Sequence, residues 1–138
     1  MRYFMLTLIV ILVAACSGQA AKPVTGPDVV AAFKAAGLEA ENTTDMQPKD
    51  YGPAPYVCKG TRFIIPSLGK TAAGDDQGGR IFVCDNGDDL KKLQDYYVKL
   101  GQASALFYSH TYAKGPVLVQ INGQIDKSVA DKYGAAIP

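Results

Sequence analysis

Two short segments in the middle of the chain constrain its fold more than any other part: TRFIIPSLG at 61–69 and GRIFVCD at 79–85. Successive side chains of a strand point to opposite faces of a sheet, and both segments carry apolar residues at consecutive positions. Strands of this kind occupy central positions in a sheet that is covered at least partly on both sides. The alternating sets are Phe63 and Ile65 against Ile64, and Ile81 and Val83 against Phe82 and Cys84.

Three segments predict the helices that cover such a sheet. Residues 88–100 show helical spacing of apolar residues between charged ones, and Gly101 is expected to end this helix. A proline in the first turn and Gly37 after the last one predict a helix over 27–36. The segment 125–137, IDKSVADKYGAAI, predicts a short amphipathic third helix. The apolar stripe of the middle helix is Leu90, Leu93, Tyr97 and Leu100.

The order of these segments predicts the fold class. SALFYSHTY at 104–112 and VLVQI at 117–121 are expected to form a hairpin across AKGP, and Asn122-Gly123 turns the chain into the third helix. The order is then α-β-β-α-β-β-α. It indicates one α+β domain over 26–138, with an antiparallel or mixed sheet of four to five strands packed by about three helices.

The pattern of the N-terminal residues predicts a targeting segment. Arg2 precedes the uncharged run Tyr3–Ala15, whose thirteen residues would span only ~20 Å as a helix against the ~30 Å of a hydrocarbon core. A cleaved signal peptide fits this length better than a stable membrane span. The residues at its end, Val13-Ala14-Ala15-Cys16, resemble the lipobox of bacterial lipoproteins.

The lipobox resemblance implies that residues 1–15 are a signal peptide and that Cys16 carries lipid. Two or three acyl chains hold a protein durably on a bilayer. Residues 16–25 would then form a flexible, lipidated tether. The chain would sit on the extracytoplasmic side, at the outer face of the plasma membrane or at an outer membrane where the organism has one. An ordinary secretory signal and an uncleaved anchor are the alternatives.

The distribution of charge limits the classes of binding partner that we expect. Without Arg2 the chain holds thirteen basic and thirteen acidic residues, with no block of like charge. Nucleic acid is therefore not an expected partner, because its binding needs a concentrated basic face. Contact with the membrane is expected through the lipid on Cys16, and an envelope protein or ligand remains as the other partner.

Export permits disulfides, and Cys58 and Cys84 are the remaining cysteines. We expect them to form a bridge, with two buried thiols as the alternative. No metal site is predicted, because His110 is the sole histidine and the spacings of a zinc site are missing. No cofactor is implied.

The stretch 45–60, DMQPKDYGPAPYVCKG, is rich in proline and glycine and is therefore not expected to form a helix or a central strand. It suits a lid that Cys58 ties to the core, and a rigid binding loop is the alternative. Tyrosine offers a large contact area with a polar tip. A candidate contact patch is Tyr51, Tyr56, Tyr108 and Tyr112, for which ordinary core and rim packing is the other interpretation.

Two polar clusters look like binding motifs. Asp85-Asn86-Gly87-Asp88-Asp89 has oxygen ligands but lacks the spacing of a calcium loop, so we expect it to cap the next helix. GDDQGG at 74–79 lacks the lysine of a P-loop, and its acids would repel phosphate, so a hairpin connection is expected.

No catalytic set is found. Histidine is a common residue of acid–base catalysis, which makes His110 the candidate. Ser109 beside it is expected to point to the opposite strand face, and His110 is expected to share a face with Leu106, Tyr108 and Tyr112. The segments RFIIPSLG, GGRIFV and VLVQING are similar to small bacterial lipoprotein domains, a resemblance that implies no activity. The expected function is a non-enzymatic binding or interaction domain of the envelope. A small hydrolase using His110 and a purely structural envelope component are the alternatives.

Overall fold

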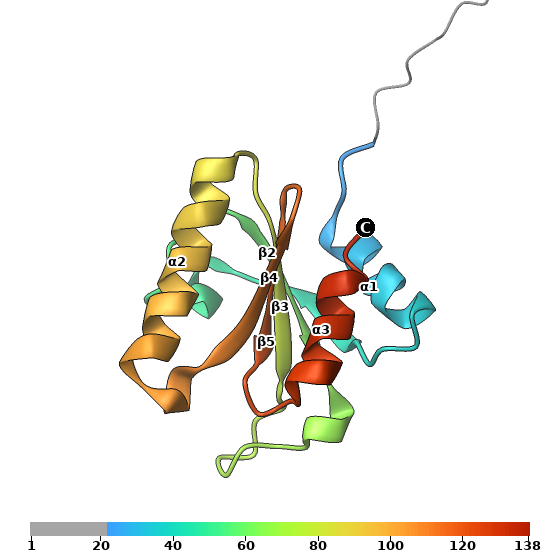
Figure 1. Ribbon diagram of the computed structural model, residues 1–138, viewed down its shortest axis with the longest axis vertical. Coiled ribbons are helices and arrows are strands. Elements are labelled where there is room, and N and C mark those ends of the chain that lie inside the picture. The colour runs from blue at the N-terminus through green and yellow to red at the C-terminus, as the bar shows by residue number, and fades with distance from the viewer. Residues whose placement is uncertain (1–21) are drawn as a thin grey trace, which may run out of the picture.

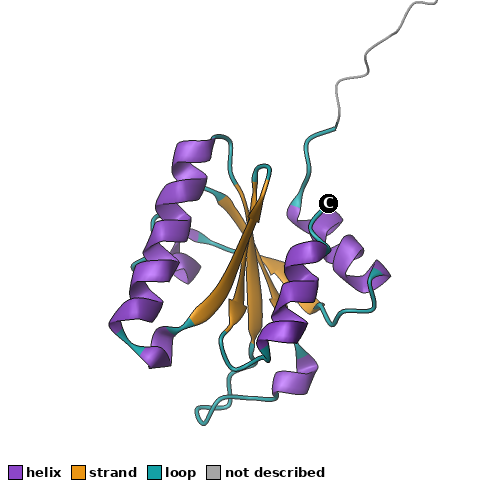
Figure 2. Cartoon of the chain, viewed as in Figure 1, coloured by secondary structure: helices purple, strands orange, loops and turns teal. Residues whose placement is uncertain are grey.

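The computed structural model describes residues 22–138 and confirms the α+β class (Figures 1 and 2). The predicted signal peptide 1–15, the predicted lipidation site Cys16 and the first part of the predicted tether lie outside the described residues. One antiparallel sheet runs in the order β1-β2-β3-β5-β4. The elements are α1 (Gly26–Ala35), β1 (Glu41–Asp45), β2 (Lys59–Ile64), β3 (Gly78–Val83), α2 (Gly87–Ala103), β4 (Ser109–Lys114), β5 (Val117–Asn122) and α3 (Lys127–Ala135).

Helices cover both faces of the sheet, as the apolar character of β2 and β3 predicts. Helix α2 lies on one face, and α1 and α3 lie side by side on the other (Figure 1). The predicted split holds, since Phe63, Ile65 and Ile81 join the core under α1 and α3, whereas Phe82 and Cys84 join the core under α2. Within residues 22–138 we find no helix long and apolar enough to cross a bilayer.

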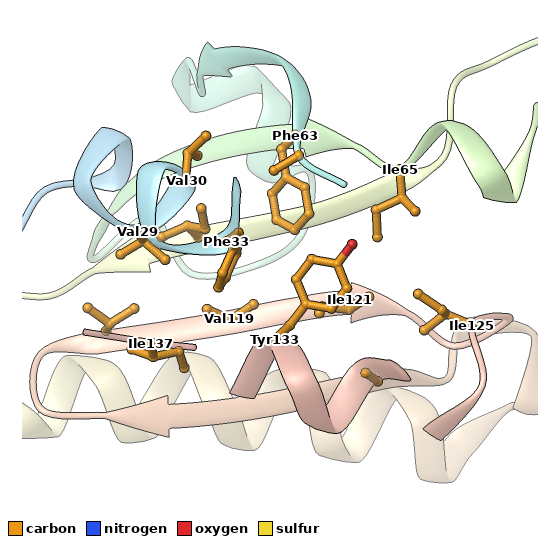
Figure 3. Packing of buried hydrophobic residues seen from close by; sticks show 14 residues of the cluster. Val29, Val30, Phe33, Phe63, Ile65, Val119, Ile121, Ile125, Tyr133 and Ile137 are labelled. Atoms are coloured by element: carbon orange, nitrogen blue, oxygen red, sulfur yellow. The ribbon is translucent and has the colours of Figure 1, made fainter. Parts of the chain in front are cut away.

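Three aromatic rings hold the core under α1 and α3 (Figure 3). The ring of Phe33 on α1 meets the edge of Tyr133 on α3 at a centroid distance of 5.1 Å and the ring of Phe63 on β2 at 5.6 Å. Phe63 and Tyr133 stack at 6.0 Å. Such pairs add to the free energy gained by burying the rings. Two helices far apart in the sequence are thereby joined through one strand.

The core under α2 contains the predicted disulfide. Cys58 and Cys84 are bonded, with their Cα atoms 4.5 Å apart. The stretch 45–60 covers this core as a lid, and the hydroxyl of the buried Tyr51 donates a hydrogen bond to the carbonyl of Cys58 at 2.7 Å. Contrary to expectation, the stretch also contains a 3-10 helix, η1 (Pro48–Tyr51), and its last two residues begin the central strand β2. Prolines stop an α-helix, but proline at the first position suits a short 3-10 turn.

The helix ends are built from the predicted signals. Thr25 and Asp28 form a reciprocal capping box at the start of α1. After α1, the amide of Gly37 (φ 74°) bonds Lys34 and the amide of Leu38 bonds Phe33, the two bonds of a Schellman stop. Thr25 thus belongs to the folded domain although it lies in the predicted tether.

The edge strand β1 was not predicted from the sequence, so the observed order has one strand more than α-β-β-α-β-β-α, while the total of five lies within the expected four to five. Its residues, ENTTD, are exposed throughout and carry no apolar alternation. The pairing with β2 shifts between Glu41 and Thr44, and Asn42 lies at φ 46°. Charges and such irregularities protect an edge from pairing with other chains.

Two expected boundaries were wrong. Helix α2 continues through Gly101 to Ala103, and a Cβ at Gly101 would meet Tyr108 at 3.3 Å, so this glycine permits close packing instead of ending the helix. The segment 104–112 is a strand only from Ser109 onward. Its first part is a 3-10 turn, η3 (Ala105–Phe107), capped by the Ser104 side chain. The apolar residues of this turn are exposed, so their spacing does not indicate a buried face of a strand.

Candidate functional site, a groove beside helix α2

The sheet face under α2 changes from apolar to polar along its strands. Phe82 of β3 pairs with Leu118 of β5, and both are fully buried beneath α2. Two positions away from this pair on the same face, Arg80 of β3 lies opposite Gln120 of β5. The residues that continue this row on the other strands are also polar. This polar row crosses all five strands and consists of Thr44, Arg62, Arg80, Gln120 and Thr111.

An open groove of about 740 Å³ lies over the centre of this row. Its floor is formed by Arg62, Arg80 and Gln120, continued by Gly78 and Asn122. One wall is the β2–β3 connection from Thr71 to Gln77. The other wall is the end of α2 with the turn that follows it, including Leu100, Ala105, Leu106, Phe107 and Tyr108. The volume is in the range of small-molecule sites.

Arg62 and Arg80 are direct cross-strand partners on the groove floor. Within residues 22–138 neither guanidinium has a carboxylate oxygen within 4.0 Å. Like charges placed directly opposite each other on a sheet repel. Both guanidinium groups therefore line the groove without a carboxylate at ion-pair distance among the described residues.

Neighbouring side chains orient the two guanidinium groups. The Nε of Arg62 donates a hydrogen bond to the Thr44 hydroxyl at 2.9 Å, and Nη1 of Arg80 donates to the Gln120 side-chain oxygen at 3.2 Å. Burial raises the pKa of the Tyr97 hydroxyl, and the positive charge of Arg80 acts in the opposite direction. A guanidinium has five N–H groups, so these bonds position each arginine without using up its donors.

The rim of the groove is apolar and exposed. Leu106 is 84% exposed, Phe107 53% and Tyr108 49%, and these three residues follow one another in the chain. Exposed apolar residues that stand singly are ordinary, but a contiguous group at a groove is typical of a binding surface. The turn is held in shape by the Ser104 hydroxyl, which accepts a hydrogen bond from the Leu106 amide at 3.2 Å.

The β2–β3 connection also brings acids to the groove. Asp76 lines it and pairs with Lys70 at 3.0 Å, while Asp75 lines it and is held through its amide by the Thr71 hydroxyl at 3.1 Å. The expected hairpin connection is confirmed, with an isolated bridge between Lys70 and Asp76. The acids lie on the wall, whereas the arginines lie on the floor.

His110 lies outside the groove, on the edge strand β4, where a smaller hollow of about 590 Å³ is lined by Tyr108, Tyr112 and Lys127 among others. His110 is 7% exposed. Its Nε2 is 3.0 Å from the carbonyl oxygen of Ile125, which can only accept, so Nε2 carries the proton. Its Nδ1 then accepts from the Tyr108 hydroxyl at 3.3 Å. Both ring nitrogens are thus bonded to groups other than a carboxylate.

The residues around His110 do not form a nucleophile-and-base arrangement. Ser109 points to the other sheet face, as expected, and its Oγ is buried without a partner. The nearby Asp131 accepts hydrogen bonds from Lys127 and Tyr112, each at 2.7 Å. The Lys127 bond and then the Tyr112 bond lower the pKa of Asp131. Leu106, in contrast to expectation, does not share the face of His110, because it belongs to the turn η3.

The four tyrosines of the candidate contact patch lie in separate places. Tyr51 is buried in the core under α2, where its ring meets that of the exposed Tyr56 at 4.7 Å. Tyr108 lies at the groove rim, and the half-buried Tyr112 packs on the opposite face, against Gly134 of α3. The structure therefore brings Tyr108, but not the other three, to the groove.

The remaining sequence motif has a structural role. Asn86 caps α2, its side chain accepting a hydrogen bond from the Asp89 amide at 2.9 Å, which confirms the capping interpretation of this cluster. Within residues 22–138 no three histidine, cysteine or acidic side chains are grouped as metal ligands.

The arginine pair was not predicted from the sequence. A usable signal was present, because Arg62 and Arg80 are the chain's arginines apart from Arg2, and each stands in the middle of a predicted strand. Comparison with protein-family models, with curated proteins and with solved structures gave no match.

Proposed function

We propose that this protein is a lipid-anchored lipoprotein on the extracytoplasmic side of a bacterial membrane, and that its domain binds a ligand or partner without catalysing a reaction. The lipobox Val13-Ala14-Ala15-Cys16 supports the anchor. The bond between Cys58 and Cys84 supports an oxidising compartment. The binding role is carried by one observation: the sheet face beside α2 is left open over a polar row, with the exposed segment 106–108 on its rim.

The anchor is tested on the full chain expressed in bacteria. Mass spectrometry of the mature N-terminus is expected to find an acylated Cys16, and Cys16→Ser is expected to move the protein from the membrane fraction to the soluble fraction. An unmodified peptide that runs through Ala15-Cys16 would contradict the anchor.

The binding role is tested by placing a photo-reactive residue at Leu106 in the lipid-anchored chain within intact envelopes. The matched control carries the same residue at Lys132, which is exposed on α3 on the opposite face of the sheet. We expect a discrete adduct from position 106 that is missing from position 132. Equal labelling at both positions, or none at position 106, would contradict binding in the groove.

A further inference from the structure

We infer that the groove binds a small organic anion that carries a carboxylate or a phosphate monoester next to an apolar portion, and that Arg62 and Arg80 hold the anionic group together. The inference rests on the proposed binding function and names the chemical class of its ligand.

The two cations on the groove floor are both arginines. All eleven basic residues of 16–138 other than Arg62 and Arg80 are lysines, and they are scattered along the sequence. The planar guanidinium matches a carboxylate or phosphate through two parallel hydrogen bonds, which a lysine ammonium does not provide. The two arginines of the domain are nevertheless direct neighbours on adjacent strands.

The charges on the groove floor favour an anionic ligand. An anion placed over the pair would replace repulsion between two cations by attraction to both. No carboxylate of residues 22–138 does so, since neither arginine has one within 4.0 Å. The Thr44 and Gln120 side chains that bond the guanidinium groups are neutral, so neither bond forms an ion pair.

The walls of the groove indicate the chemistry of the rest of the ligand. The groove has the size of a small-molecule site, and its α2 wall offers Leu100, Leu106 and Phe107. A ligand with an apolar part beside its anionic group would bury this exposed surface. The opposite wall, formed by the β2–β3 connection, carries Asp75 and Asp76, and the Asp76 charge is offset by Lys70. The negative charge of Asp75 would repel an anion in the groove, so a variant without this charge serves as an internal control.

The test uses the full acylated chain in nonionic detergent, titrated calorimetrically at constant ionic strength. The probes are benzoate and phenyl phosphate, and the comparison compound is benzamide, which has the same ring without the charge. We expect saturable binding of at least one anion, about tenfold tighter than benzamide. The anion that binds more tightly identifies the group the arginines recognise. Binding of both anions that is no tighter than that of benzamide would overturn the inference.

The variants assign the binding to the arginine pair. Arg62→Gln and Arg80→Gln are each expected to weaken anion binding about tenfold, and the lysine variants R62K and R80K are expected to recover only part of that loss. Lys92→Gln removes a charge on the exposed side of α2 and serves as the control, with a change below about twofold. Equal weakening by K92Q and R62Q would show general attraction and overturn the inference.

Asp75→Asn is expected to change the anion affinity in the direction opposite to the arginine variants, or not at all. It removes a negative charge from the same groove, so anion binding is expected to stay equal or become tighter. Weaker binding would contradict the assignment. The thermal unfolding midpoint of each variant verifies folding. If position 106 yields an adduct in the envelope while no anion binds, the ligand class is wrong and the binding function stands.

Discussion

The hydroxyl of Tyr133 donates a hydrogen bond to the backbone carbonyl of Glu39, 94 residues earlier in the chain, at 2.8 Å. Tyr133 is buried between Phe33 and Phe63 (Figure 3). The contact joins the last helix to the segment that follows the first helix. The two ends of the domain are therefore expected to unfold together.

Removing this hydroxyl tests that coupling. Tyr133→Phe keeps the ring but leaves the Glu39 carbonyl without its donor, so we expect a loss of about 1 kcal/mol in the free energy of unfolding. Urea unfolding near neutral pH measures it. A single cooperative transition with the lower midpoint is expected. Unchanged stability would contradict the role of the bond.

The raised pKa of Tyr133 predicts that the fold loses stability at alkaline pH. Burial, and next the charge of Glu39, raises the pKa of Tyr133 to about 12. The ordinary pKa is about 10, so the folded state holds the proton more tightly than the unfolded state. Its contribution is complete below about pH 10 and declines as the pH rises toward about 12. Urea unfolding at several pH values should show a smaller decline for Y133F than for the parent chain.

The disulfide predicts a stability that depends on the redox state. Cys58 and Cys84 are separated by 26 positions, and closing a loop of this length stabilises a fold by about 3 kcal/mol in the chain-entropy model. We expect the double variant C58A/C84A and the reduced parent chain to lose a similar amount in urea unfolding. Cys16→Ser is the control and should leave domain stability unchanged. A reductant effect on C58A/C84A would contradict this assignment.

The cap of α2 predicts a graded effect. Asn86→Ala removes the acceptor of the Asp89 amide and is expected to cost about 1 kcal/mol, whereas Asn86→Ser retains a capping oxygen and should cost much less. Thermal or urea unfolding of the two variants measures the difference. Equal losses for alanine and serine would indicate that the side chain contributes by something other than capping.

His110 is expected to act as a structural hydrogen-bonding residue. Nitrogen NMR of the neutral ring should show the proton on Nε2 and none on Nδ1, because Ile125 offers an acceptor and Tyr108 a donor. His110→Phe is expected to cost about 1–3 kcal/mol in stability, with anion binding in the groove unchanged. The opposite tautomer, or lost anion binding in the folded variant, would contradict this arrangement.

Much of the fold was predictable from local patterns. The two-sided apolar character of β2 and β3 predicted a sheet covered on both faces, because strand side chains alternate. Gly37 and Asn86 marked helix ends through backbone conformation and capping, which depend on neighbouring residues. The edge strand β1 could not be predicted, because its exposed side chains form no apolar pattern in the sequence.

The candidate site was not predictable in the same way. Arg62 and Arg80 are 18 positions apart in the sequence, and only the register between β2 and β3 places them opposite each other. The apolar residues at 105–107 suggested a buried strand, yet Ser104 caps a turn there and leaves Leu106 at the groove rim. Both facts depend on contacts that a local pattern does not contain.

The sequence by itself determined the α+β class, the end of α1, the start of α2, the pairing of Cys58 with Cys84 and the expectation of a lipid anchor at Cys16. These features follow from local periodicity, capping chemistry and a small number of cysteines. The tertiary structure alone decided which part of the sheet α2 leaves open and which charges meet there. That choice follows from strand register and from the length of one helix, because both set the distance between residues that are remote in the chain.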